Sequence, residues 1–228
     1  MRSTLKRYLF IFVALEAALV FSVWFASGPN ITVSENHAFT VAIDAGHGGI
    51  DGGAVGTTSG VKESDINLAI AKKLRDRFTD LSFNVVMTRS GEGGLYGLPS
   101  AGFKRRDLEE RVKIVNGSKA DVLISVHLNK YGDGSRRGAQ VFYRAGDEKS
   151  KALAESLQKS FNAMKEAVKK TTPLVGDYFL LNETAIPAVI CECGFLSNAE
   201  DEALLLSEDY QLALCEAISI GTSEFFAS

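Results

Sequence analysis

Short apolar runs and longer amphipathic stretches alternate along most of this chain. The apolar runs have the length of β-strands and lie at residues 39–45, 83–88, 121–127, 138–143 and 188–194. The stretches between and after them are expected to be helices at residues 64–81, 107–118, 149–170, 199–206 and 208–226. Strands interleaved with helices predict one α/β domain with a mostly parallel central sheet flanked by helices.

The ends of these elements give further expectations. Asp107 is placed to cap the second helix, and the long helix at 149–170 ends in lysines, which suit a helix C-terminus. Residues 90–103 are rich in glycine and follow no period. We therefore expect them to form an exposed loop near the mouth of a cleft.

The N-terminus differs from the rest of the chain. Residues 8–26 form a run of 19 residues with one charge, Glu16, and basic residues precede the run. Such a helix would span about 28 Å, with its basic flank in the cytoplasm and the rest of the chain outside. Whether it is an uncleaved anchor or a cleaved signal stays open, because small residues at 26–28 are followed directly by Pro29. The expected organisation is a membrane anchor or signal segment at 1–27, a linker at 28–38 and a catalytic domain at 39–228.

Composition narrows the class of protein only slightly. A net charge of −3 gives no indication of nucleic-acid binding, and 46% hydrophobic residues are ordinary for a globular protein. Of the three cysteines, Cys191 and Cys193 lie two apart on one strand face, which is poor geometry for a disulfide. We expect Cys191, Cys193 and Cys215 to be free and mostly buried.

Three polar residues lie where elements begin or end. His47 stands among glycines after the first strand, Glu63 opens the next helix, and His127 closes the strand at 121–127. Glycines allow positive φ and a close approach of the backbone to whatever the imidazole holds. Two His and one Glu are the ligands of an open zinc site, with the remaining coordination left for water and substrate. We expect one Zn²⁺ on His47, Glu63 and His127.

A fourth polar residue, Glu192, interrupts an apolar strand. A carboxylate buried there needs a cation, a hydrogen-bond donor or a water-filled site. It is either the base that a zinc hydrolase needs besides its ligands, or the ion-pair partner of Arg106 or Arg111. Asp44 is the rival base, although its place three residues before His47 suits the orientation of the loop or of an imidazole better.

Five segments in order resemble the zinc-dependent N-acetylmuramoyl-L-alanine amidases of the amidase 3 family. They lie at residues 43–56, 62–68, 108–116, 125–129 and 192–198. The resemblance implies a single α/β domain, zinc ligands at His47, Glu63 and His127, and a catalytic glutamate at Glu192. Asn129, two residues after His127, is a candidate to hold substrate.

The implied reaction is hydrolysis of the amide between the lactyl group of N-acetylmuramic acid and the L-alanine of the peptide stem. An N-terminal apolar segment followed directly by the catalytic domain resembles the spore-cortex members of the family, which remove stems so that muramic-δ-lactam can form for germination. The expected partners are peptidoglycan, a membrane through the N-terminal helix, and an accessory or activator protein, but no nucleic acid. The expected location is outside the cytoplasmic membrane, anchored or secreted.

Two other functions stay open at this point. A different zinc peptidase could act on the peptide stem itself, and a catalytically silent protein could serve as a wall-binding scaffold. The four residues His47, Glu63, His127 and Glu192 disfavour a scaffold, because it would not need all of them.

Overall fold

The structure is a computed structural model that describes residues 38–228. The expected anchor or signal segment at 1–27, and the linker up to residue 37, lie outside the described residues. Over 38–228, no helix is both long enough and apolar enough to cross a membrane.

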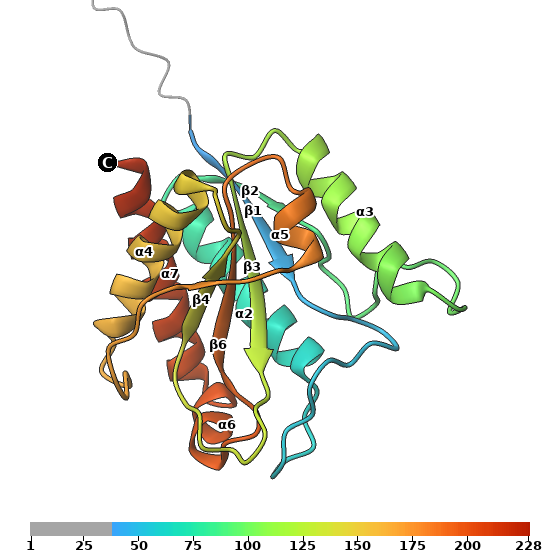
Figure 1. Ribbon diagram of the computed structural model, residues 1–228, viewed down its shortest axis with the longest axis vertical. Helices are drawn as coiled ribbons and strands as arrows, with labels where there is room; N and C mark the ends of the chain where they lie inside the picture. The colour runs from blue at the N-terminus through green and yellow to red at the C-terminus, as the bar shows by residue number, and fades with distance from the viewer. Residues whose placement is uncertain (1–37) are drawn as a thin grey trace, which may run out of the picture. The chain divides into compact units, whose positions relative to one another are not determined.

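A six-stranded sheet forms the centre of the described domain (Figure 1). Its strands, in chain order, are β1 (Thr40–Ala45), β2 (Asn84–Met87), β3 (Val122–Asn129), β4 (Gln140–Tyr143), β5 (Leu174–Val175) and β6 (Ala188–Phe195). They are arranged in the order β2-β1-β3-β6-β4-β5, and only the β4–β6 pair is antiparallel. The expected α/β fold with a mostly parallel sheet is confirmed.

Helices cover both faces of this sheet, as Figure 1 shows. They are α2 (Glu63–Asp80), α3 (Phe103–Gly117), α4 (Glu148–Asn162), α5 (Phe179–Glu183), α6 (Ala199–Leu205) and α7 (Glu208–Phe226). Alternate residues of a strand point to opposite faces, so Val41 and Ile43 join the large core with α2, α4 and α7, whereas Ala42 joins a smaller core with α3 and α5. The face with α3 and α5 carries the smaller of the two cores.

Two helix boundaries differ from the prediction. Helix α3 begins at Phe103, after Gly102 in a left-handed conformation, and Asp107 lies inside the helix. There Asp107 accepts hydrogen bonds from Arg111 Nε at 2.6 Å and from the backbone of Leu95. The prediction of Asp107 as a cap was therefore wrong, because the helix begins four residues before it and its two carboxylate oxygens bind Arg111 and the loop instead.

Helix α4 ends at Asn162, eight residues before the predicted end. The side chain of Asn162 donates to the carbonyl of Thr171 at 2.8 Å and accepts from its N–H at 3.0 Å. This pair of bonds folds the chain back toward β5, so the lysines at 165–170 do not lie on a helix. The sequence pattern did not indicate β5 or α5, which are two and five residues long.

Two further expectations about the fold agree with the structure, except that the loop predicted at 90–103 ends one residue earlier, where α3 begins. Residues 90–102 carry no helix or strand, and Arg106 holds this loop by donating to the carbonyls of Tyr96, Leu98 and Ala101. The three cysteines are free and buried.

Candidate active site

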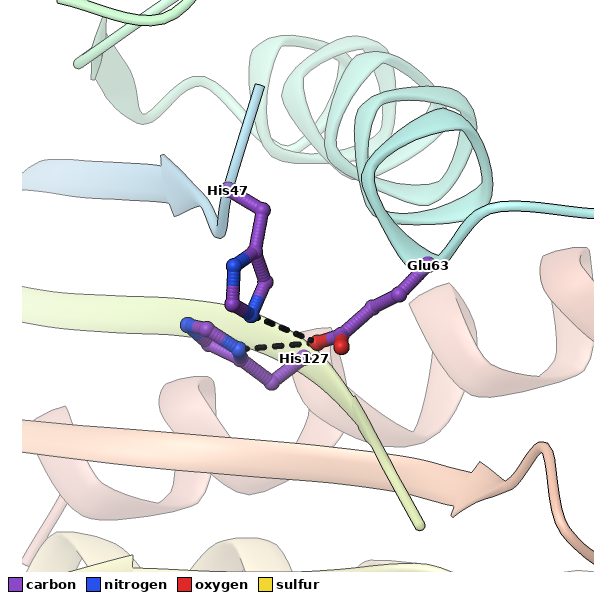
Figure 2. Close-up of side chains that lie close together, drawn as sticks. All are labelled: His47, Glu63 and His127. Carbon is purple, nitrogen blue, oxygen red and sulfur yellow. Dashed lines mark hydrogen bonds and ion pairs between the residues drawn. The ribbon is translucent and has the colours of Figure 1, made fainter. Parts of the chain in front are cut away.

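The predicted metal ligands converge at the carboxyl ends of the central strands. His47 follows β1, His127 lies near the end of β3, and Glu63 is the first residue of α2 (Figure 2). One ligand atom from each of the three residues lies within 4.8 Å of the other two. Among the described residues, this is the one group of three or more such side chains that could hold a metal ion.

Glu63 is the centre of this cluster. Its Oε1 lies 2.9 Å from His127 Nδ1 and 3.3 Å from His47 Nε2. The backbone N–H of Leu128 donates to the same oxygen at 3.0 Å, and that of Ala54 donates to Oε2 at 2.8 Å. These bonds fix the carboxylate of Glu63, so one of its oxygens faces both imidazoles.

The glycines of the β1–α2 loop make this approach possible. A Cβ on Gly46 would collide with the ring of His127, and a Cβ on Gly53 would collide with Glu63 and His47. His47 itself has a φ of 61°, in the left-handed region. These glycines therefore let the loop backbone lie close to the candidate ligands. The left-handed conformation of His47 is strained, so contacts with surrounding residues must stabilise it.

Arg111 supplies much of that support. Its side chain is fully buried and donates to the carbonyl oxygens of Ala45 at 2.7 Å and His47 at 2.6 Å. It also forms ion pairs with Asp44 and Asp107, both at 2.6 Å. An α3 residue thus fixes the backbone of the loop that carries His47.

The partners of Asp44, the rival base, give it a structural role. Besides Arg111, the hydroxyls of Thr88 and Ser125 donate to its carboxylate, each at 2.6 Å. Burial alone would raise the pKa of Asp44, but the charge of Arg111 and these hydroxyls outweigh it and lower the pKa to about 2. Within residues 38–228, Asp44 has no bond to an imidazole, so it orients the loop through Arg111 and is poorly suited to accept a proton.

Sequence reasoning missed Asp51, which lies in the same loop four residues after His47. Its Oδ2 lies 3.0 Å from His47 Nδ1, and its Oδ1 lies 3.1 Å from Lys104 Nζ on α3. A carboxylate on the outer nitrogen of a histidine fixes the tautomer and strengthens the imidazole as a ligand. The sequence signal that could have identified Asp51 is an acidic residue just after His47 in a glycine-rich loop.

The electrostatics of the cluster favour a cation. Burial opposes the charged imidazolium, but Glu63 and Asp51 outweigh it and raise the pKa of His47 to about 9; Glu63 raises the pKa of His127 in the same way. The two imidazoles in turn hold the pKa of Glu63 far below its usual value, against the effect of burial. Two nitrogens and a carboxylate oxygen are a donor set that suits Zn²⁺, and three protein ligands leave a coordination position open. The residues present therefore fit a zinc ion.

Glu192 lies beside this cluster, directly opposite His127 in the register of β3 and β6. It is 7% exposed, and its Oε2 has no hydrogen-bond partner among the described residues. Over residues 38–228 it makes no ion pair with Arg106, which holds the 90–102 loop, or with Arg111. The alternative of an arginine partner was therefore wrong. Burial raises the pKa of Glu192 to about 7, and neighbouring Glu63 adds to the effect of burial, against the opposing charges of the two imidazoles.

A cavity of about 730 Å³ opens in front of these side chains. His47, His127 and Glu192 line one side, and residues of α3 and the α5 region, including Lys104, Leu108, Tyr178 and Phe179, line the other. Asn129 does not line this cavity. It lies at the end of β3, where its Oδ1 accepts from the N–H of Lys130 at 2.8 Å, and it faces a second groove described below.

Comparison with known proteins identifies the family of this chain. A family model described as N-acetylmuramoyl-L-alanine amidase, Amidase_3, matches residues 41–223. The germination-specific N-acetylmuramoyl-L-alanine amidase of Bacillus subtilis (strain 168) is 32% identical over 189 residues, covering 82% of this chain and 79% of that protein.

Solved structures that are similar to this chain are also amidases. The CwlD amidase from Clostridioides difficile, in complex with the GerS lipoprotein, superposes with a TM-score of 0.79 at 34% identity, covering 83% of this chain and 98% of that one. The catalytic domain of CwlV from Bacillus (Paenibacillus) polymyxa var. colistinus superposes with a TM-score of 0.71, also at 34% identity, and the covered shares are again 83% and 98%. The chain therefore belongs to the Amidase_3 family of N-acetylmuramoyl-L-alanine amidases.

Proposed function

We propose that this amidase is zinc-dependent and processes the peptidoglycan of the spore cortex. The observation that carries the proposal is that His47, Glu63 and His127 lie beside Glu192, which is buried and has one carboxylate oxygen without a partner among the described residues. In this arrangement three residues would hold a metal, and the fourth would remain available to move a proton.

His47, Glu63 and His127 would be the protein ligands of one Zn²⁺. A zinc ion held there would act as a Lewis acid, polarising the lactyl carbonyl and making water a stronger acid. Asp51 orients His47 through its outer nitrogen.

Glu192 is the proposed general base and acid. Its carboxylate accepts a proton as the water oxygen bonds to the lactyl carbonyl carbon. It then donates this proton to the alanine nitrogen as the carbon–nitrogen bond breaks, which yields a free stem amine and a lactyl carboxylic acid, and the acid releases its remaining proton at neutral pH. Within residues 38–228 no arginine pairs with Glu192, which supports this role.

The cortex assignment rests on the relatives. One similar protein is germination-specific and another is CwlD. We infer that this chain removes stems from cortex peptidoglycan, so that muramic-δ-lactam can form before germination. It would act outside the cytoplasmic membrane, with the segment at 1–27 as its membrane anchor or signal.

A protein partner is part of the proposal. The CwlD structure was solved in complex with a lipoprotein. A lipoprotein of the same kind, also held at a membrane surface, is the accessory protein that we propose for this chain.

Product analysis of digested cortex peptidoglycan tests the proposed function. The amidase releases stems with a free L-alanine amine and leaves muramic acid with an intact lactyl carboxylate. A chelator should abolish this release, and added Zn²⁺ should restore it. Products cut within the stem, or release that chelation does not affect, would contradict the proposal.

A further inference from the structure

A second groove lies on the other side of Glu192. It has an open volume of about 1120 Å³, and its lining includes Asn129, Arg136, Gln140, Phe142, Lys169 and Thr171. These residues come from the end of β3, the β3–β4 connection, β4 and the segment that follows α4. The proposed roles of the metal ligands and of Glu192 do not use this groove.

The groove begins one strand away from Glu192. Gln140 of β4 is the register partner of Glu192 in the antiparallel β4–β6 pair, and neighbouring strands lie about 4.8 Å apart. The ring of Phe142 contacts that of Tyr178, with centroids 5.6 Å apart, and Tyr178 lines the first cavity. The two hollows are therefore neighbours on one face of the sheet, separated by this aromatic pair, with Glu192 beside it.

The two hollows differ in charge. In the first cavity, Lys104 is paired with Asp51, and nearby Arg105 is paired with Glu109 and stacked on Phe179. In the second groove, Arg137 is paired with Glu200 and Asp201. Over the described part of the chain, Arg136 and Lys169 have no acidic partner; Arg136 only stacks on Tyr131, at 4.1 Å. Uncompensated positive charge therefore gathers in the second groove.

These cations have no evident structural role. The helix dipole does not explain Lys169, because α4 ends at Asn162, seven residues earlier. The segment that carries Lys169 is instead tied to the groove wall: Asn162 binds Thr171, and Gln140 Nε2 donates to the carbonyl of Thr172 at 2.8 Å. Two basic segments far apart in the sequence are thereby brought to one groove next to Glu192.

We propose that this groove binds the peptide stem of the substrate, and that Arg136 and Lys169 recognise its free carboxylates. This inference rests on the proposed function, which places the scissile amide at Glu192. A stem extends by at most about 3.5 Å per residue, so the residues after L-alanine reach a groove that starts one strand away. The glycan then lies in the first cavity, where Tyr178 and Phe179 offer aromatic surface.

Asn129 completes the recognition. Its side-chain oxygen is used by the N–H of Lys130, whereas its amide N–H groups have no acceptor among the described residues. Because Asn129 lines the groove, we infer that these groups donate to a stem carbonyl or carboxylate.

The test compares two substrates on the full-length, zinc-loaded protein. One is N-acetylmuramoyl tetrapeptide with free carboxylates, and the other is the same molecule with these carboxylates amidated. The double variant Arg136→Ala/Lys169→Ala should raise KM for the acidic stem about tenfold, with kcat unchanged, because two exposed charge pairs are lost. Neither constant should change for the amidated stem.

Two controls accompany the double variant. Lys72→Ala removes an exposed lysine on α2 that makes no ion pair over the described residues, and it should leave both substrates unaffected. The charge-conserving exchange Arg136→Lys/Lys169→Arg should keep the wild-type KM. Calorimetry with the free tetrapeptide should show the same loss of affinity in the alanine variant without any turnover.

The outcomes separate this inference from the function on which it rests. If the wild type cleaves both substrates and the double variant shows an unchanged KM, or an equal rise for both substrates, the stem groove is wrong and the amidase stands. If the wild type releases no L-alanine amine from either substrate, the proposed function fails, and the groove assignment fails with it.

Discussion

His127 on β3 and Glu192 on β6 stand opposite each other in a parallel strand pair. Residues in register on neighbouring strands project to the same face, so an imidazole of the metal cluster and a buried carboxylate share one side of the sheet. Glu192 is bound by no arginine over the described residues and keeps one oxygen without a partner. This relationship allows the role of Glu192 to be tested separately from metal binding.

Glu192→Gln should keep zinc bound while turnover falls by roughly 10²–10⁴, because glutamine retains the size of the side chain but cannot accept the proton. The melting temperature should not fall, since no arginine loses a counter-charge. Zinc content, melting temperature and muropeptide release are measured on one preparation. Near-normal turnover per zinc-loaded molecule would remove Glu192 from the mechanism.

His47→Ala, Glu63→Ala and His127→Ala should each lower zinc occupancy and abolish hydrolysis. Because the metal would join β1, α2 and β3, chelation should lower the melting temperature of the wild type but have little effect on the variants. Metal analysis and thermal unfolding with and without chelator check this. Glu155→Ala, an exposed carboxylate on α4, is the control. Unchanged zinc stoichiometry in all three variants would disprove the site.

Asp51→Asn should weaken zinc binding by about 10- to 100-fold, because the charged acceptor on the outer nitrogen of His47 is lost. Competition with a chromophoric chelator measures the affinity. Lys104→Met removes the other partner of Asp51 but leaves its contact with His47, so its effect should be clearly smaller. Equal effects of the two substitutions would show that the loop, and not the imidazole, depends on Asp51.

Asp44→Asn should destabilise the fold in a pH-dependent way. The pKa of Asp44 is lowered from 3.8 to about 2, so the ionised carboxylate contributes roughly 2–3 kcal/mol of stability at neutral pH. A lowered pKa means that this contribution is complete above pH 3.8 and is lost as the pH falls toward 2. The difference in unfolding free energy between wild type and variant should shrink over that window, as measured by urea unfolding of chelated protein. A difference independent of pH would contradict the assigned ionisation.

Deletion of residues 1–27 should leave a soluble domain that binds zinc, whereas the full-length protein should partition with membranes. The apolar run at 8–26 and the basic residues before it are the reason. Membrane fractionation and protease protection check both expectations. Full-length protein found free in the cytosol would contradict the anchor and the exported location together.

The sequence by itself determined the α/β class, the strands β1, β2, β3, β4 and β6 and the helices α2, α6 and α7. It also indicated His47, Glu63 and His127 at element ends and Glu192 within an apolar strand. This was possible because these signals are local. Apolar runs and helical spacing recur within a few residues, and a polar residue at the end of a buried strand stands out against its neighbours.

Only the tertiary structure decided which charged groups meet. Arg111 pairs with Asp44 across 67 positions and not with Glu192, Asp51 joins His47 to Lys104, and Asn162 ends α4 by binding Thr171. The antiparallel placement of β4 brings Gln140 next to Glu192 and the basic segments around Arg136 and Lys169 into one groove. Such choices depend on distances between residues far apart in sequence, and several partners with the same local character compete for each charge. Periodicity and composition carry no information about that competition, because it is decided by which groups the packed sheet and helices leave within hydrogen-bonding distance.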